Sequence, residues 1–140
     1  MPYKYLEGIT SADIAFEATG KTAEEMFESA GLAVTNTMVR DVKAIEPKIK
    51  KTIRKKANET EKLLFDFLEE LIYLKDAEQL LFSKFDIKIK DGKELVAIAY
   101  GEKIDPKKHE LIVDAKAVTY YRFEVKKTNS GWRAVVVIDV

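Results

Sequence analysis

Cysteine is absent from this chain of 140 residues, and histidine occurs once, at position 109. Without cysteine there can be no disulfides, no thiolate metal ligands and no cysteine nucleophile, so we expect no structural zinc. A single histidine cannot form a dense metal cluster. Any reactive or metal-binding site must therefore consist of carboxylates, with His109 as the only imidazole.

Other features are missing as well. No apolar run approaches the ~20 residues of a membrane helix, and residues 1–8 lack the apolar core of a signal peptide. No glycine-rich phosphate loop or nucleophile elbow occurs. The 24 basic and 24 acidic residues balance, so no overall charge attracts nucleic acid or membrane. We expect one cytoplasmic domain, residues 1–140, long enough to bury a core and without a membrane partner.

Alternating and helical hydrophobic patterns together predict an α+β fold. Residues 13–20, "DIAFEATG", alternate as in a strand, and residues 22–39 repeat as in a helix that begins with a capping box at Thr22. Residues 48–57, "KIKKTIRKKA", alternate again, and residues 63–72 give the strongest helical pattern, opened by Asn58 and Glu61.

Hairpin signals dominate the rest of the chain. Asp91-Gly92 separates "FDIKIK" from "ELVAIAYG", and "TNSG" separates the last two predicted strands. The order indicates two helices packed on one face of a mostly antiparallel sheet, as a single domain. The strand residues expected in the core are Ile14, Phe16, Ile87, Ile89, Val135 and Val137.

The chain closes with "WRAVVVIDV", an apolar strand that ends on a carboxylate, Asp139. Asp13 stands at the head of the first predicted strand, and Val140 adds an α-carboxylate. If these two strand ends are neighbours, the carboxylates converge, and oxygen ligands of this kind select Ca²⁺ or Mg²⁺. The alternative is that Asp13 caps a turn and Asp139 is a solvated end.

Two further groups are candidates for chemistry or binding. The basic stretch 48–56, with Lys50, Arg54 and Lys56, could contact RNA phosphates or an acidic partner. It lacks interleaved aromatics, and it is also what a strand edge protected by lysines looks like. His109 lies in a charged loop, where it either takes part in acid–base chemistry or fixes the loop by hydrogen bonds.

Six segments, taken in order, resemble the archeases, small proteins that assist the RNA ligase of tRNA splicing. They are "SADIAFEATGKTAEEMFESAGLAV", "LLFDFLEELIYL", "LLFSKFDIKI", "YGEKIDPKKHE", "DAKAVTYYRFEV" and "GWRAVVVIDV". The resemblance covers nearly the whole chain. Thr10 and Tyr121 stand where the family often has histidine, whereas the aspartates are kept.

The resemblance implies a function and a metal site. Archeases promote guanylylation of the ligase, let it turn over many times and broaden its nucleotide choice. Their partner is the catalytic subunit of the RNA-splicing ligase, and they reach tRNA indirectly through it. They bind a divalent ion, calcium, through positions that correspond to Asp13, Asp139 and Val140 here. The resemblance therefore implies an activator that is not itself an enzyme.

Two other classes stay open at this point. A metal-dependent hydrolase would use Asp13, Asp139 and His109. An RNA-binding or chaperone-like module would use residues 48–56. Lys50, Arg54, Lys56 and His109 are the candidates for contact with a partner.

Overall fold

A computed structural model describes residues 2–7 and 13–140 of the chain. In this part of the chain there are two α-helices, one short 3-10 helix and seven strands. In chain order they are β1 (Tyr3–Leu6), β2 (Ile14–Gly20), α1 (Ala23–Met38), η1 (Val42–Ala44), β3 (Ile49–Lys56), α2 (Thr60–Glu78), β4 (Leu80–Lys90), β5 (Glu94–Lys103), β6 (Ala117–Thr128) and β7 (Gly131–Asp139).

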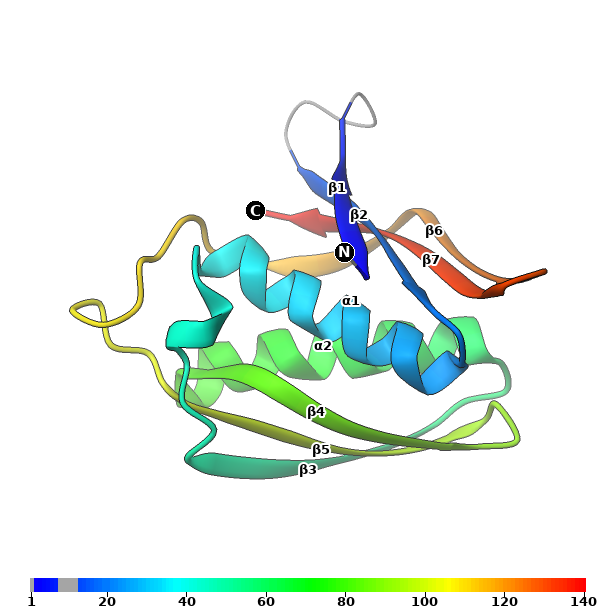
Figure 1. Cartoon of the computed structure of the whole chain (residues 1–140), viewed down its shortest axis with the longest axis horizontal. Helices are drawn as coiled ribbons and strands as arrows, with labels where there is room; N and C mark the ends of the chain where they lie inside the picture. Colours follow the sequence, from blue (N-terminus) through cyan, green and yellow to red (C-terminus); the bar gives the residue numbers. More distant parts are fainter. Residues whose placement is uncertain (1, 8–12) are drawn as a thin grey trace.

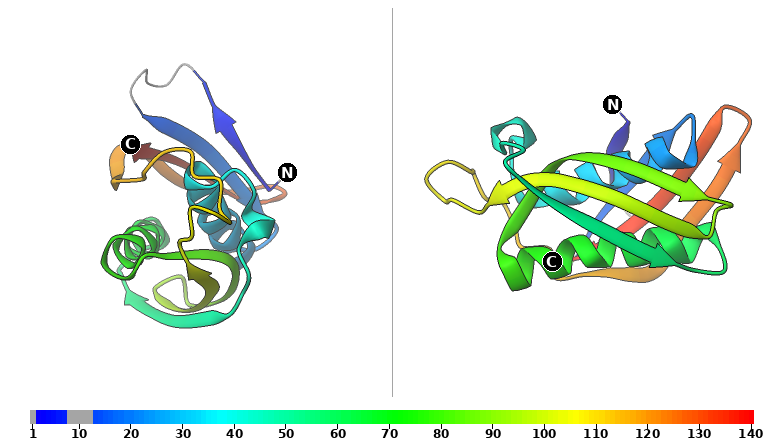
Figure 2. Two further views of the ribbon diagram at one scale, coloured as in Figure 1. Left: turned by 90° about the vertical axis from the view of Figure 1, so that its left-hand side faces the viewer. Right: turned by 90° about the horizontal axis from the view of Figure 1, so that it is seen from below.

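The strands form two antiparallel sheets, and both helices lie between them (Figure 1). One sheet has the order β1-β2-β7-β6 and the other the order β3-β5-β4. Helix α1 contacts β2 on one side and β4 on the other, and α2 contacts β6 and β3 (Figure 2). The predicted α+β class is confirmed, and the structure adds that the strands are divided between two sheets.

The core face of β7 differs from the expectation. Val136 and Ile138 belong to the hydrophobic core cluster that faces the helices. Val135 and Val137 are also buried, but they lie outside that cluster because side chains alternate across a strand. The run of apolar residues in β7 hides the period of two, so the sequence pattern did not show which face is inner.

Helix α1 is buried on two sides because it packs against both sheets. Thr22 is its N-cap and accepts a hydrogen bond from the backbone N–H of Glu25 at 3.1 Å, as the capping pattern predicted. Polar side chains on the buried sides bond to backbone carbonyls: Thr35 donates to Phe82 O at 2.7 Å. Gly31 lies against the ring of Phe85, so a Cβ there would approach the ring to 2.8 Å.

Helix α2 begins at Thr60, later than a cap at Asn58 would place it. Its N-cap is Glu59, which makes no side-chain capping bond, whereas the sequence pattern favoured Asn58. Its apolar side faces the core through Leu63, Leu64, Phe67 and Leu68, all fully buried. None of the helices in the described ranges is long and apolar enough to span a bilayer.

The hairpins follow the turn signals. Asp91 and Gly92 both have positive φ, 55° and 69°, and connect β4 to β5 as predicted. Strand β6 pairs with β7 but shifts register between Thr119 and Glu124. The sequence analysis did not predict this irregularity, nor the short strand β1, because neither has a marked local pattern.

The contact between Gly31 and Phe85 can be tested by substitution. Gly31→Ala should cost about 1–3 kcal/mol through overpacking and regain about 1 kcal/mol in helix propensity, so the free energy of unfolding should fall by up to about 2 kcal/mol. Urea unfolding measures the change. In a Phe85→Leu background, which removes the ring, the same substitution should be neutral or stabilising. An equal loss in both backgrounds would contradict this explanation.

Candidate functional site

The two candidate aspartates lie at neighbouring strand ends. Strands β2 and β7 are antiparallel, and Ile14 pairs with Ile138. Asp13 and Asp139 are the next residues in this register, one on each chain segment. Directly opposed residues of an antiparallel pair point to the same side, with Cα atoms about 4.5–5.5 Å apart. The two strand ends are therefore neighbours, which was the condition for the carboxylates to converge, and we call Asp13 and Asp139 the carboxylate pair.

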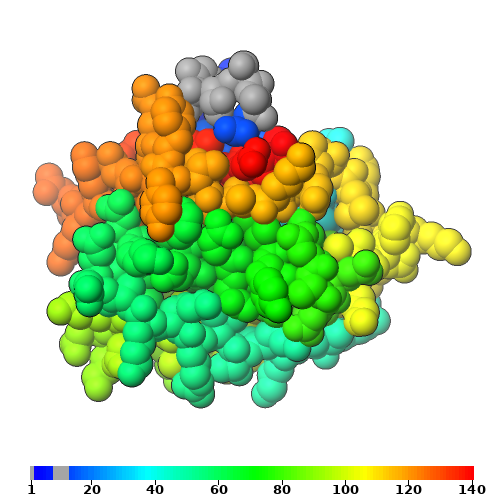
Figure 3. All heavy atoms as spheres, turned by 180° about the vertical axis from the view of Figure 1, so that it is seen from behind, coloured from blue at the N-terminus to red at the C-terminus, as the bar shows by residue number. Residues whose placement is uncertain are grey.

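The backbone of Asp139 is held from two sides. On one side Asp139 is opposite Ala117 of β6, and its carbonyl accepts the N–H of Lys116 at 2.8 Å. On the other side the preceding residue, Ile138, pairs with Ile14 of β2. Lys75 of α2, 6% exposed, anchors the same segment by donating to Ala115 O at 2.8 Å. Figure 3 shows the last residues, in red, at the surface beside the yellow-orange segment that leads into β6. The backbone is therefore fixed where the Asp139 side chain meets solvent.

The other members of the site are partly enclosed. Asp13 is half-buried and borders a hollow of ≈ 310 Å³, together with Asn36, Thr37 and Ile112. Val140 is half-buried and packs against the core, which keeps its backbone close to Asp139. Thr10 and Ser11 lie outside the described residues.

The chemistry of this arrangement favours a hard cation. Like charges directly opposite each other on neighbouring strands are destabilising, and a cation between them removes the repulsion. Carboxylate oxygens suit Ca²⁺ or Mg²⁺. Within residues 2–7 and 13–140, no group of three or more His, Asp or Glu side chains could hold a metal. A cation at the carboxylate pair would therefore need the α-carboxylate and water as further ligands.

The predicted basic residues lie on the outer face of β3. Lys50, Arg54 and Lys56 are exposed, whereas Ile53 between them is buried, as the alternation predicted. Strand β4 adds exposed lysines to the same face of the sheet, and these lysines were not among the predicted basic residues. The alternation "KFDIKIK", residues 84–90, was the signal for it, since Lys84, Lys88 and Lys90 share one parity.

His109 is fixed inside the loop between β5 and β6. Its ring is 1% exposed. Nδ1 accepts the backbone N–H of Asp105 at 3.0 Å, so Nε2 carries the hydrogen that it donates to Glu102 Oε2 at 2.9 Å. Both nitrogens are thus occupied within the loop. Of the two interpretations from the sequence, the geometry supports the one in which His109 fixes the loop.

Glu102 is the centre of this network. Burial by itself would raise the pKa of Glu102, but hydrogen bonds from Lys108, from the Glu46 backbone N–H and from His109 outweigh it and lower the pKa to about 2. Lys108 Nζ lies 2.8 Å from Glu102 Oε2, and the Glu46 N–H donates to the same oxygen at 2.8 Å. The network joins the loop to the segment that precedes β3.

Known proteins resemble this one over nearly the whole chain. A model of the archease protein family matches residues 3–140. The chain belongs to the archease family. It is 42% identical to the protein archease of Pyrococcus furiosus over 134 residues, which is 93% of this chain and 94% of the relative. It is 39% identical to the protein archease of Methanosarcina mazei over an aligned length of 142 residues that covers 99% of this chain and 95% of the relative.

Solved structures agree with this archease fold. The solution structure of a Methanobacterium thermoautotrophicum protein has a TM-score of 0.85 and 33% identity, and 99% of each chain is covered. The crystal structure of an archease from Thermotoga maritima, described as a possible chaperone, has a TM-score of 0.63 and 21% identity over 94% and 93% of the chains. The second likeness shows the fold alone.

The network around Glu102 makes stability depend on pH. The pKa is about 2 in the folded protein and about 4.5 in the unfolded chain, so the unfolded state binds more protons between these values. The stabilisation is present above about pH 4.5 and is lost as the pH falls toward about 2. Replacing Glu102 by glutamine should therefore destabilise most near neutral pH, and the difference from wild type should shrink below pH 4.5.

Chemical unfolding of both proteins across this pH range measures the difference. Glu110→Gln is the control, because Glu110 pairs with Arg40 where both side chains are exposed, and such pairs contribute little. A difference between wild type and Glu102→Gln that stayed constant down to about pH 3 would contradict the lowered pKa of Glu102.

Proposed function

We propose that this chain activates the RNA ligase of tRNA splicing and does not itself join RNA. In this proposal it promotes guanylylation of the ligase, lets the ligase turn over many times and broadens its nucleotide use. Family membership supports the proposal for the chain as a whole. The observation that supports the site is the register of β2 and β7, in which Ile14 and Ile138, the chain neighbours of Asp13 and Asp139, face each other.

Asp13, Asp139 and the α-carboxylate of Val140 would hold a divalent cation, which we propose to be Ca²⁺. The cation would supply charge neutralisation and a fixed positive point at the end of the sheet. The protein supplies rigidity: β2 and β6 flank β7, and Lys116 holds the carbonyl of Asp139. A rigid site of this kind suits an activator, which needs only to bind one state of its partner more tightly than another.

The hydrolase alternative finds less support. It requires His109 to act together with the carboxylate pair. The two ring nitrogens of His109 are engaged by Asp105 and Glu102, on the loop between β5 and β6. The RNA-binding or chaperone-like alternative would use residues 48–56, of which Lys50, Arg54 and Lys56 are exposed on β3.

Removing one member of the carboxylate pair tests the proposal. Asp13→Asn and Asp139→Ala should each abolish stimulation of the cognate ligase and weaken Ca²⁺ binding, while the fold stays intact because neither side chain is in the core. Ligase guanylylation, multiple-turnover RNA joining and calorimetric titration with Ca²⁺ give the readouts.

Asp91→Asn is the matched control. Asp91 is an exposed carboxylate in the β4–β5 turn, and asparagine tolerates its positive φ. The control should stimulate like wild type. Normal stimulation by both variants of the carboxylate pair would refute the site. Ligase guanylylation that does not change when the wild-type protein is added would refute the function.

Extending the chain tests the role of Val140. A tag fused directly after Val140 removes the α-carboxylate and should weaken Ca²⁺ binding and ligase stimulation, whereas the same tag before Met1 should be tolerated. The comparison uses calorimetry with both tagged proteins. Full Ca²⁺ affinity of the carboxy-extended protein would show that the terminus is not a ligand.

A further inference from the structure

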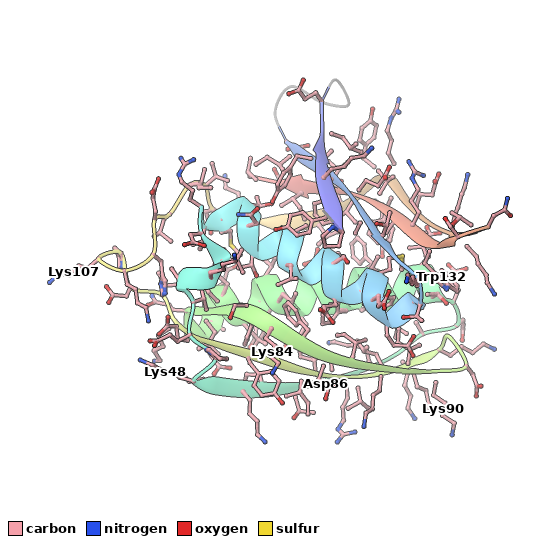
Figure 4. The ribbon with its side chains drawn as sticks, viewed as in Figure 1. Lys48, Lys84, Asp86, Lys90, Lys107 and Trp132 are labelled. Atoms are coloured by element: carbon pink, nitrogen blue, oxygen red, sulfur yellow. The ribbon has the colours of Figure 1, made fainter. Side chains whose placement is uncertain are left out.

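The outer face of the β3-β5-β4 sheet is open to solvent. Its inner face is covered by the helices and carries buried residues such as Ile53, Phe85 and Leu95. Figure 2, in the view from below, shows no other element of the described chain crossing the outer face. The side chains of Lys84, Asp86 and Lys90 follow β4 on this side (Figure 4).

This outer face concentrates positive charge, although the basic and acidic residues of the whole chain are equal in number. The two outer strands, β3 and β4, carry six exposed cations on this face. The face also carries two carboxylates, Asp86 of β4 and Glu94 of β5. We call this surface the cationic sheet face. Its cations are Lys50, Arg54, Lys56, Lys84, Lys88 and Lys90.

The register aligns these cations in three pairs across the central strand. Lys50 and Lys84 both lie opposite Tyr100 of β5. Arg54 and Lys88 lie in the same way opposite Val96.

Lys56 and Lys90 form the third pair, opposite Glu94. With strands about 4.8 Å apart, the two rows run about 9.6 Å from each other. Along each row the first cation is about 13.6 Å from the second, because Thr52 or Asp86 lies between them, and the second is about 6.8 Å from the third. The cationic sheet face therefore presents two parallel rows of positive charge.

Protection of the strand edges does not explain the pattern fully. The lysines of β3 on the helix side are paired: Lys51 with Glu78 at 2.7 Å and Lys55 with Glu70 at 3.0 Å. Among the described residues, only Lys56 of the six cations on the outer face has a carboxylate within 4.0 Å, Glu94 at 3.3 Å. Within β3 and β4, the cations left without an anion are thus gathered on one face, where an external anion can reach them.

The strip between the two rows is apolar and aromatic. Val96, Ile98 and Tyr100 are half-buried on β5, and the ammonium of Lys84 lies 5.4 Å from the ring centroid of Tyr100. A hollow of ≈ 440 Å³ opens beside Arg54, Lys88 and Val96. Single-stranded nucleic acids bind to surfaces that combine a cationic track for the backbone with apolar or aromatic side chains for the bases.

We propose that the cationic sheet face binds single-stranded nucleic acid, with phosphates on the two rows and bases over the strip of Val96, Ile98 and Tyr100. The strip that contains Tyr100 gives bases a surface on which to stack, and an acidic peptide has no bases to use it. This chemistry favours a nucleic acid over an acidic peptide. The surface lies on the opposite side of the helices from the carboxylate pair (Figure 1), so the inference is independent of ligase activation.

Fluorescence anisotropy with a labelled oligouridylate of about 12 nucleotides tests the proposal, because such a strand has no stable structure and is within the range of known site sizes. The full chain should bind it with an affinity that falls as salt rises. Lys84→Glu with Lys88→Glu should weaken binding more than tenfold.

The matched control is Lys43→Glu with Lys107→Glu, which makes the same change in net charge at exposed lysines off this face. The control should bind like wild type. Equal affinity of the two double variants would overturn the proposal, because binding would then depend only on net charge. Circular dichroism and thermal unfolding establish that each variant is folded.

Two further variants separate phosphate contacts from base contacts. Lys84→Ala with Lys88→Ala should reduce the slope of log affinity against log salt by about 1.4, since each phosphate contact on a single strand contributes about 0.7. Tyr100→Leu should weaken binding about tenfold and leave that slope unchanged. No effect of Tyr100→Leu would overturn the placement of bases over the strip. Tighter binding of polyglutamate than of oligouridylate would overturn nucleic acid as the ligand.

Discussion

The antiparallel pairing of β2 with β7 is the interaction on which most of this structure depends. It joins segments from opposite ends of the chain, in one register from Ile14–Ile138 to Gly20–Trp132. Val136 and Ile138 are fully buried against the core, and full burial of such side chains is worth about 1.5–3 kcal/mol each. On β2, a shift by one residue would turn the buried Phe16 and Ala18 outward and the half-buried Glu17 inward, so burial holds the register. The carboxylate pair is a consequence of that register.

Helix α1 connects this pairing to the rest of the fold. Because it contacts β2 on one side and β4 on the other, a single helix supplies core to both sheets. That position explains a glycine within a helix, since Phe85 occupies the space of a Cβ at Gly31. It also explains why Ser29 and Thr35, although buried, donate to backbone carbonyls of Thr19 and Phe82. Their hydroxyls are satisfied inside the protein and attach the helix to both sheets.

The same three-layer arrangement separates two kinds of charged surface. The carboxylate pair is at one end of the β1-β2-β7-β6 sheet, and the unpaired lysines are on the outer face of the β3-β5-β4 sheet. The carboxylate pair and the cationic sheet face therefore belong to different sheets, although the acidic and basic totals in the sequence are equal. His109 belongs to neither surface, because the network with Glu102 and Lys108 keeps it inside the loop.

The sequence by itself determined the local elements. Period-two and helical repeats, the Thr22 cap and the Asp91-Gly92 turn led to the α+β class, and the family resemblance pointed to Asp13 and Asp139. These signals are local because they depend on neighbouring residues only. Tertiary structure decided which strands share a sheet, which side of β7 faces the helices, and that β3 and β4 display their lysines on one face. Those features depend on pairing between segments that are distant in the chain. The alternation within a single strand shows neither which sheet the strand joins nor which of its two faces points inward.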